Sequence, residues 1–270
     1  MISNKNLVAV VIPIYQTELT LIELSILEHN LEILNSYPIV IVCPQDLNVF
    51  NIPIFRNCQK LDIKRFSNNY FTSIEGYNEL MLASEFYSYF SEFRYVLICQ
   101  TDAFVFKDEL SSWCDKNYDY IGGPWLGSSN NRYLNKLNSL LADFNLIKRR
   151  DTWFLFKVGN GGFSLRKVSS FLKVLAHPAY NELINSIRGA SGEHVFATED
   201  LFWSFKAKEL VPDFYIPDYI EACGFSTDRR PNIALKIHKS LPFGCHGLGR
   251  PNVWKFWKDL IKRILKSENR

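Results

Sequence analysis

Runs of consecutive apolar residues alternate with amphipathic stretches in the first hundred residues. Residues 7–14 and 38–43 are β-rich apolar runs, and the segment between them repeats apolar side chains at helical spacing among glutamates. A strand, a helix and a second strand at this spacing predict a βαβ unit with parallel strands. Residues 95–99 form another continuous apolar run, as expected of a strand covered on both faces. We therefore expect an α/β protein with a mostly parallel central sheet flanked by helices, in a Rossmann-like arrangement.

The pattern is weaker in the rest of the chain and predicts shorter elements. We expect strands at 52–55, 61–66, 118–121 and 212–220, and helices at 78–90, 168–175 and 199–210. Residues 126–155 change character and begin with loop chemistry rich in Gly, Ser and Asn, so we treat them as an insertion or mobile loop. Residues 251–270 interleave Trp, Phe, Leu and Ile with lysines, which predicts a basic amphipathic helix. Packing on the domain and contact with a membrane surface both explain such a helix.

Composition excludes several classes of protein. The chain has 270 residues, 47% of them hydrophobic, which is enough for a sizeable core. A net charge of +3 gives no reason to expect a nucleic-acid partner. The six cysteines form no C-x-x-C pair, so we interpret them as reduced thiols and expect a cytoplasmic protein. The N-terminus lacks the apolar segment of a signal peptide, and no apolar run reaches the ~20 residues needed to span a bilayer.

A single carboxylate, Asp102, follows the apolar run at 95–99. Ligands of open α/β sheets bind just outside the carboxyl ends of strands, and a buried carboxylate must be paired, hydrogen-bonded or metal-bound. An Asp that caps a helix starting near Asp108 explains the same position equally well.

Three other features are individually weak. Three glycines in residues 159–162 permit positive φ and close approach to a ligand, although a tight hairpin is the simpler interpretation. Glu199 and Asp200 follow Thr198 at a predicted helix start, where acids commonly oppose the helix dipole. His246 is alone, and a lone histidine is more often structural than a ligand. Neither G-x-G-x-x-G nor G-x-x-x-x-G-K follows the first strand, which argues against a dinucleotide or P-loop site.

Taken in order, these segments resemble a bacterial family of glycosyltransferases with a GT-A-like fold. The resemblance covers most of the chain and rests on residues 73–78, 100–105, 119–125, 158–166 and 241–247. It implies one GT-A-like domain at 1–250, with a nucleotide-binding half at 1–125 and an acceptor half at 156–250, followed by the basic tail at 251–270. It also implies transfer of a sugar from a nucleotide donor, expected to be UDP-linked, to a glycan or lipid-linked acceptor in surface polysaccharide assembly.

The resemblance assigns roles by position. Gln100-Thr101-Asp102 occupies the place of a D-x-D motif, whose carboxylates hold Mg²⁺ or Mn²⁺ against the donor diphosphate. In this chain Gln100 stands where the motif has its first acid. Asp102 and His246 are therefore the expected metal ligands, and a metal-independent variant stays open. Asp200 takes the place of the catalytic base, which implies inversion, and Glu199 orients it or binds the acceptor. The donor is expected to contact Pro13, Tyr15, Tyr77, Asn78, Gln100, Thr101, Asp102, Gly161 and Gly162. Trp125 and Asn160 are expected to contact the acceptor, although core packing explains Trp125 equally well.

Two other classes of function are compatible with the pattern. A nucleotidyltransferase or metal phosphoesterase could use a similar sheet, but would need more acids around Asp102. A non-catalytic carbohydrate-binding module could use Trp125 and neighbouring aromatics. The tail at 251–270 could also bind a partner protein. The other interpretation is a peripheral membrane location, which its basic character suggests.

Overall fold

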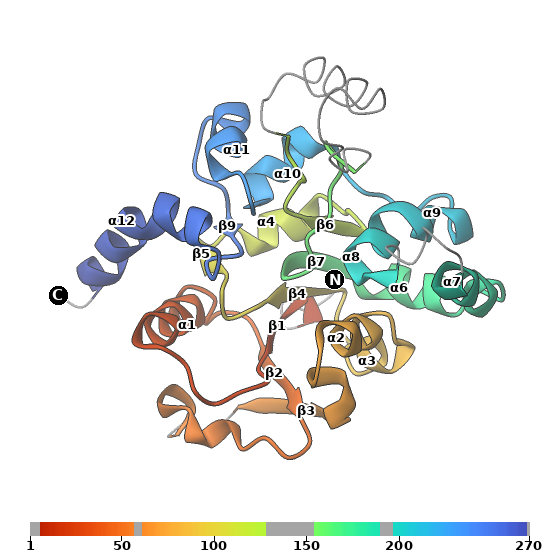
Figure 1. Ribbon diagram of the computed structural model, residues 1–270, viewed down its shortest axis with the longest axis horizontal. Coiled ribbons are helices and arrows are strands. Elements are labelled where there is room, and N and C mark those ends of the chain that lie inside the picture. The colour runs from red at the N-terminus through yellow and green to blue at the C-terminus, as the bar shows by residue number, and fades with distance from the viewer. Residues whose placement is uncertain (1–5, 57–60, 128–153, 190–196, 269–270) are drawn as a thin grey trace.

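The computed structural model describes residues 6–56, 61–127, 154–189 and 197–268. A six-stranded sheet runs through its centre (Figure 1), with strand order β3-β2-β1-β4-β7-β6. These strands are β1 (Val8–Pro13), β2 (Ile39–Pro44), β3 (Asp62–Phe66), β4 (Tyr95–Cys99), β6 (Tyr120–Gly122) and β7 (Phe163–Lys167). β3, β2, β1 and β4 are parallel, and β7 runs antiparallel to both β4 and β6. The predicted α/β fold with a mostly parallel sheet is confirmed.

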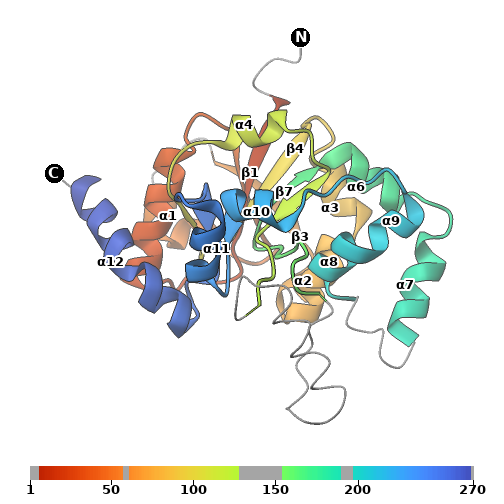
Figure 2. The ribbon, with the colours of Figure 1, turned by 90° about the horizontal axis from the view of Figure 1, so that it is seen from above.

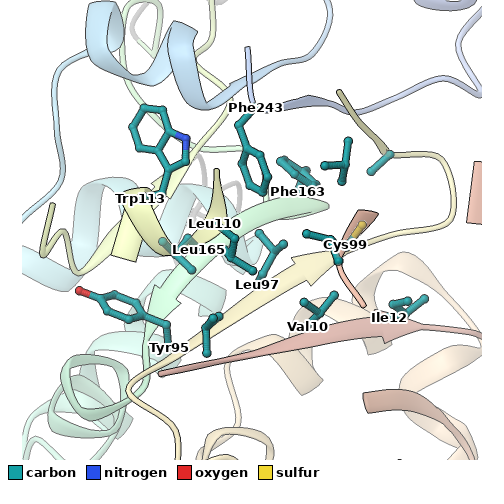
Figure 3. Close-up of a cluster of buried hydrophobic side chains, with 14 of the residues drawn as sticks. Val10, Ile12, Tyr95, Leu97, Cys99, Leu110, Trp113, Phe163, Leu165 and Phe243 are labelled. Atoms are coloured by element: carbon teal, nitrogen blue, oxygen red, sulfur yellow. The ribbon is translucent and has the colours of Figure 1, made fainter. Parts of the chain in front are cut away.

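Both faces of the sheet are buried, which explains the continuous apolar runs in the sequence. Figure 3 shows one face, where Val10, Leu97 and Leu165 from three adjacent strands meet Leu110 and Trp113. The intervening residues of β1 and β4 point to the opposite face, into a second apolar cluster, whereas the intervening residues of β7 are the buried polar Ser164 and Arg166. Successive side chains of a strand alternate between faces, so a sheet covered twice needs apolar residues at every position.

The helices form two layers around this sheet. The first face is covered by α1 (Leu21–Ile33), α4 (Leu110–Asp115) and α10 (Tyr219–Phe225). The second is covered by α2 (Ile74–Met81), α3 (Ser84–Ser88), α6 (Val168–Leu175), α7 (Tyr180–Gly189), the π-helical η6 (Phe202–Lys206) and α9 (Ala207–Leu210). Figure 2 shows the two layers on either side of the strands. The 3₁₀ turns η2 (Val49–Asn51), η3 (Pro53–Phe55) and η4 (Asn68–Phe71) and helices α8 (Glu199–Leu201), α11 (Pro231–His238) and α12 (Pro251–Glu268) complete the described elements.

A small second sheet gathers three distant segments beside the end of β4. Its order is β5 (Phe104–Val105), β9 (Gly244–Cys245) and β8 (Ser226–Thr227). Asp102 lies two residues before β5, Asp228 directly follows β8, and His246 directly follows β9. The pairing of these two-residue strands therefore brings the three ionisable side chains to one place.

Several predicted elements are wrong, each for a local reason. Residues 52–55 form η3 instead of a strand, with Pro53 in its first turn. The helix expected over 78–90 breaks after α2, which leaves the Met81 carbonyl to accept hydrogen bonds from the Tyr87 hydroxyl and the Trp203 indole at 2.9 and 3.3 Å. Residues 212–218 are irregular, and residues 219–220 begin α10.

Other predicted elements have the expected form. Strand β3 and the C-terminal helix α12 are confirmed. Residues 128–153, most of the predicted insertion, lie outside the described residues, and the division into nucleotide and acceptor halves stays a prediction. In the described part of the chain, no helix is both long enough and apolar enough to cross a membrane.

Candidate active site

Three side chains converge just beyond the carboxyl end of β4. The Nε2 atom of His246 lies 3.1 Å from Asp102 Oδ1 and 3.1 Å from Gln100 Oε1. Gly162 forms the floor of this group, since a Cβ at that position would lie 2.1 Å from His246 Nε2 and 2.5 Å from Gln100 Oε1. Asp102 therefore contacts His246 and does not cap the helix that follows near Asp108. The structure brings Asp102 and His246 together, and their role as metal ligands stays a prediction.

The other side of the His246 ring faces a second carboxylate, Asp228. Its Oδ1 lies 3.5 Å from His246 Nδ1, and it also forms an ion pair with Arg250, directly before α12. Burial alone would lower the pKa of His246, but Asp102 and Asp228 outweigh burial and raise this pKa to about 9. Burial alone would raise the pKa values of both carboxyls, but His246 and Arg250 hold them below their usual range. In the absence of other cations, a protonated His246 is thus held between two carboxylates.

Glu199 forms a buried ion pair with Arg166 beside the glycine turn. Arg166 Nη2 lies 3.1 Å from the Glu199 carboxylate, and the two side chains are 0% and 5% exposed. A Cβ at Gly161 would lie 1.5 Å from Glu199 Oε1, so only glycine fits there. Burial raises the pKa of Glu199 to about 7, and Arg166 opposes that rise. Arg166 anchors the Glu199 carboxylate, but Glu199 Oε2 has no hydrogen-bond partner among the described residues, so both predicted roles, orienting Asp200 and binding the acceptor, stay predictions.

Asp200 is the adjacent acid and is bound differently. Its Oδ1 accepts a hydrogen bond from the Leu201 backbone N–H at 2.8 Å. Burial raises its pKa, and Asp228 adds to the rise, while hydrogen bonds from the Leu201 and Asn160 backbones oppose it. Asp200 therefore neighbours both the glycine turn and the Asp228–His246 pair. Among the described residues, Asp200 forms no ion pair of the kind that Glu199 forms with Arg166, although the Arg166 charge also opposes the rise of its pKa.

Asn160, Gly123 and Ser226 meet near Asp200. Asn160 adopts a positive φ of 65°, and its Nδ2 atom is buried without a hydrogen-bond partner among the described residues, as is Ser226 Oγ. A Cβ on Gly123 would lie 3.1 Å from Asn160 Nδ2 and 3.5 Å from Ser226 Oγ. A buried donor and hydroxyl without partners favour a polar ligand or ordered water at this point. The glycine turn joins this cluster to β7 and forms no local hairpin, because β7 pairs with β4 and β6.

The remaining predicted residues are dispersed around this group. Pro13 is buried at the end of β1, and Tyr15 beyond it is 59% exposed. Asn78 Oδ1 accepts the Glu199 backbone N–H at 3.1 Å, so this side chain anchors the start of α8. Burial raises the pKa of the Tyr77 phenol to about 12, with Arg166 and Gln100 opposing the rise. Thr101 is half-buried between Gln100 and Asp102.

Trp125 lies over Gly159 and against Phe205, with the two rings stacked at 6.4 Å. A Cβ at Gly159 would lie 1.9 Å from the indole. These contacts support the core-packing interpretation of Trp125, although its side chain keeps some exposure.

Sequence reasoning missed Asp228, Arg250 and the structural role of Arg166. Asp228 follows a strand of only two residues, which produces no hydrophobic periodicity. Arg250 lies in a Gly-rich turn before a basic helix, where its charge resembles that of its neighbours. A buried arginine needs a charged partner, so the lone Arg166 in an apolar strand after the glycine turn could have predicted a buried ion pair.

The side chains around His246 fit a divalent cation. The Nε2–oxygen separations of 3.1 Å match the distance of about 3 Å between adjacent ligands of an octahedral ion with bonds near 2.1 Å. Asp228 beside Nδ1 is the kind of carboxylate that orients a metal-bound histidine. Among the described residues, no three His, Cys, Asp or Glu side chains surround a common point. The amide of Gln100 would therefore have to serve as the third protein ligand.

A family profile matches residues 60–246, which include every residue of the site except Pro13, Tyr15 and Arg250. The chain belongs to the family DUF5672. That family is described as proteins of unknown function, so membership supplies no activity. No curated protein matches the sequence.

Two solved structures share the fold. Mouse xyloside xylosyltransferase 1, in its apo form, matches with a TM-score of 0.52 and 10% identity, over 88% of this chain and 96% of that one. A glycosyltransferase involved in glycosylation of the major capsid of PBCV-1 matches with a TM-score of 0.50 and 11% identity, over 95% and 99%. At this identity the likeness shows the fold alone. The fold is therefore that of GT-A-like glycosyltransferases, as predicted.

Proposed function

We propose that this protein is a glycosyltransferase that moves a sugar from a nucleotide donor, UDP-linked, to a glycan or lipid-linked acceptor in polysaccharide assembly. The observation that carries the proposal is the convergence of Asp102, His246 and Gln100 at the end of β4, where Asp228 contacts His246 and also acts on Asp200. The shared fold supports it, since the carboxyl ends of parallel strands are where such folds bind nucleotides.

Asp102, His246 and Gln100 would hold Mg²⁺ or Mn²⁺, which when bound neutralises charge that develops on the leaving diphosphate. The chain's own residues prepare that position. Asp228 lies 3.5 Å from His246 Nδ1, an atom without a hydrogen-bond partner among the described residues, and its charge would favour the ring orientation in which Nε2 faces Asp102 and Gln100. A metal-independent variant has a specific observation in its favour, because a His246 with a pKa of about 9 carries positive charge at neutral pH.

Asp200 is the proposed base that removes the proton of the acceptor hydroxyl. Burial raises the pKa of Asp200, which makes it a stronger base than an exposed aspartate. Asn160 Nδ2 and Ser226 Oγ, which have no hydrogen-bond partner in the described parts of the chain, would bind neighbouring hydroxyls of the acceptor sugar. One displacement assisted by a base implies inversion at the anomeric carbon.

A screen of nucleotide sugars for donor hydrolysis and transfer tests the proposal. We expect one donor to be consumed by the wild type in the presence of Mn²⁺ or Mg²⁺. Asp200→Asn should lower turnover by roughly 10²–10⁴-fold and leave UDP affinity unchanged, because only the proton acceptor is lost. Full turnover by Asp200→Asn would remove the proposed base. Addition of EDTA distinguishes the metal-assisted from the metal-independent form.

A nucleotidyltransferase is disfavoured because the described residues around Asp102 supply few further acids. A non-catalytic carbohydrate-binding module would bind sugar and ignore UDP, which calorimetry separates from a transferase. A cytoplasmic location stays a prediction, supported by the buried free thiols of five cysteines.

A further inference from the structure

Positive charge is concentrated at the C-terminal end of the chain. Residues 229–268 contain ten Lys and Arg against two Asp and Glu, whereas the rest of the chain contains 21 against 26. The overall net charge of +3 therefore hides a strongly basic segment joined to an acidic body. This segment consists mainly of α11 and α12.

Helix α12 separates its apolar and basic side chains onto opposite faces. Val253, Trp257 and Ile261 are buried against α1 and the residues around β5. Lys255, Lys262 and Lys266 follow at intervals of seven and four, which places them on one line of the outer face. Phe256 is 41% exposed at the border between the two faces.

The basic face, defined as Lys255, Lys258, Lys262, Arg263 and Lys266, is not neutralised by the protein. In the parts of the chain that the structure describes, none of these five side chains forms an ion pair with an acid, although most are exposed. Elsewhere on the surface, exposed cations do pair, as Lys173 does with Asp213 and Arg188 with Glu79. Asp259 lies within this face, three residues before Lys262 and four before Arg263, and offsets part of the charge. The repulsion that remains among the five cations is relieved when an anionic surface covers them.

We propose that the basic face of α12 binds the surface of an anionic lipid bilayer. The helix would lie parallel to the surface, with its lysines on lipid headgroups and Phe256 at the boundary with the acyl chains. A bilayer is favoured over a folded protein because the charges extend along the whole helix beside an exposed aromatic ring. Figure 1 shows α12 at the edge of the molecule, clear of the sheet and of the helices on its other side.

The helix is fixed directly to the candidate active site. Arg250 immediately precedes α12 and forms an ion pair with Asp228, which contacts His246. A bilayer bound by α12 would therefore hold the start of the helix, and the site beside it, close to the membrane. If the proposed function holds, this arrangement selects an acceptor carried on a membrane lipid.

Vesicle sedimentation tests the proposal without any nucleotide sugar. The full chain should bind vesicles of phosphatidylcholine with added phosphatidylglycerol, less so at high salt, and should not bind phosphatidylcholine alone. The triple variant Lys255→Gln, Lys262→Gln, Lys266→Gln should bind about 100-fold more weakly, since each basic residue near an anionic surface contributes about fivefold. A matched control, Lys173→Gln, Arg188→Gln, Lys208→Gln, removes the same charge from α6, α7 and α9 across the molecule and should bind like the wild type.

Equal loss in both triple variants, or no binding to anionic vesicles, would overturn the proposal. Circular dichroism of each variant verifies that α12 is intact, and Phe256→Ser should weaken binding without changing net charge. Tighter binding of the wild type to duplex DNA than to anionic vesicles, lost with the same three lysines, would assign the face to nucleic acid instead. Sugar transfer to a soluble acceptor is measured separately, so failure there would count against the proposed function and not against this surface.

Discussion

Replacement of Arg166 by methionine should destabilise the protein severely. The Arg166 side chain is 0% exposed and lies between the glycine turn and the second apolar cluster. It donates hydrogen bonds to Tyr87 Oη, Ser164 Oγ, the Gly161 carbonyl and the Glu199 carboxylate, at 2.8, 3.0, 3.2 and 3.1 Å. Methionine fills similar space but offers no donor, so it leaves a buried carboxylate without its cation.

The expected loss is about 3–5 kcal/mol in the free energy of unfolding, the range for removing one partner of a buried ion pair. Burial raises the pKa of Glu199 and Arg166 opposes that rise, so without the arginine this pKa should increase further. The folded variant would then keep a proton on Glu199 that the unfolded chain releases above the ordinary value of 4.5. The folded state of the variant holds more protons than its unfolded chain, so its stability falls as pH rises. The wild-type Glu199 has a pKa of about 7, so the wild type loses stability in parallel up to that pH, and the deficit of the variant should grow as pH rises above about 7.

Urea unfolding followed by tryptophan fluorescence measures this loss. The double variant Arg166→Met, Glu199→Gln should be more stable than Arg166→Met at neutral pH, because glutamine is neutral and folding no longer has to bind a proton at position 199. Arg188→Met is the control, since its partner Glu79 is 56% exposed and exposed pairs contribute at most about 1 kcal/mol. The reasoning fails if Arg166→Met stays within 1 kcal/mol of the wild type, or if the double variant gains nothing.

Two further predictions concern the group around His246. Gly162→Ala would place a methyl group 2.1 Å from His246 Nε2, so it should weaken the Mn²⁺ affinity measured by calorimetry. The control Gly189→Ala, with no described atom within 4 Å of the added methyl group, should leave this affinity unchanged. Equal affinities in the two variants would contradict a metal site beside His246. In cation-free buffer, His246 has a folded pKa of about 9 against an ordinary 6.5, so its stabilisation, of order 3 kcal/mol, is complete below pH 6.5 and is lost as pH rises through 9. Urea unfolding across this range should show that loss for the wild type and a flatter profile for His246→Gln; parallel profiles would contradict the assignment.

The sequence predicted the parallel part of the sheet because burial on both faces leaves an unmistakable trace. Residues 95–99 are apolar at every position, and the structure buries all five. The pairing of Asp102 with His246 came from a resemblance in motif order, since nothing local to either residue indicates the other. The contact between them depends on β5 and β9, which pair through only two residues each.

What the sequence did not predict depends on long-range contacts of very short elements. Asp228 reaches His246 only because β8 lies beside β9, and two-residue strands carry no pattern. The break between α2 and α3 is fixed by Tyr87 and Trp203, which contact the Met81 carbonyl from 6 and 122 residues away. The strand expected at 212–220 failed because two prolines in this stretch remove backbone donors.

Calorimetric titration of the protein with UDP, with and without Mn²⁺, tests the central claim most directly. The account predicts saturable binding of UDP that tightens with Mn²⁺. It also predicts that this enhancement disappears in both Asp102→Asn and His246→Gln, because the first removes the carboxylate charge and the second the imidazole Nε2 of the same 3.1 Å contact. A wild-type protein that ignores UDP, or variants that keep the full enhancement, would contradict a sugar-nucleotide site at the end of β4.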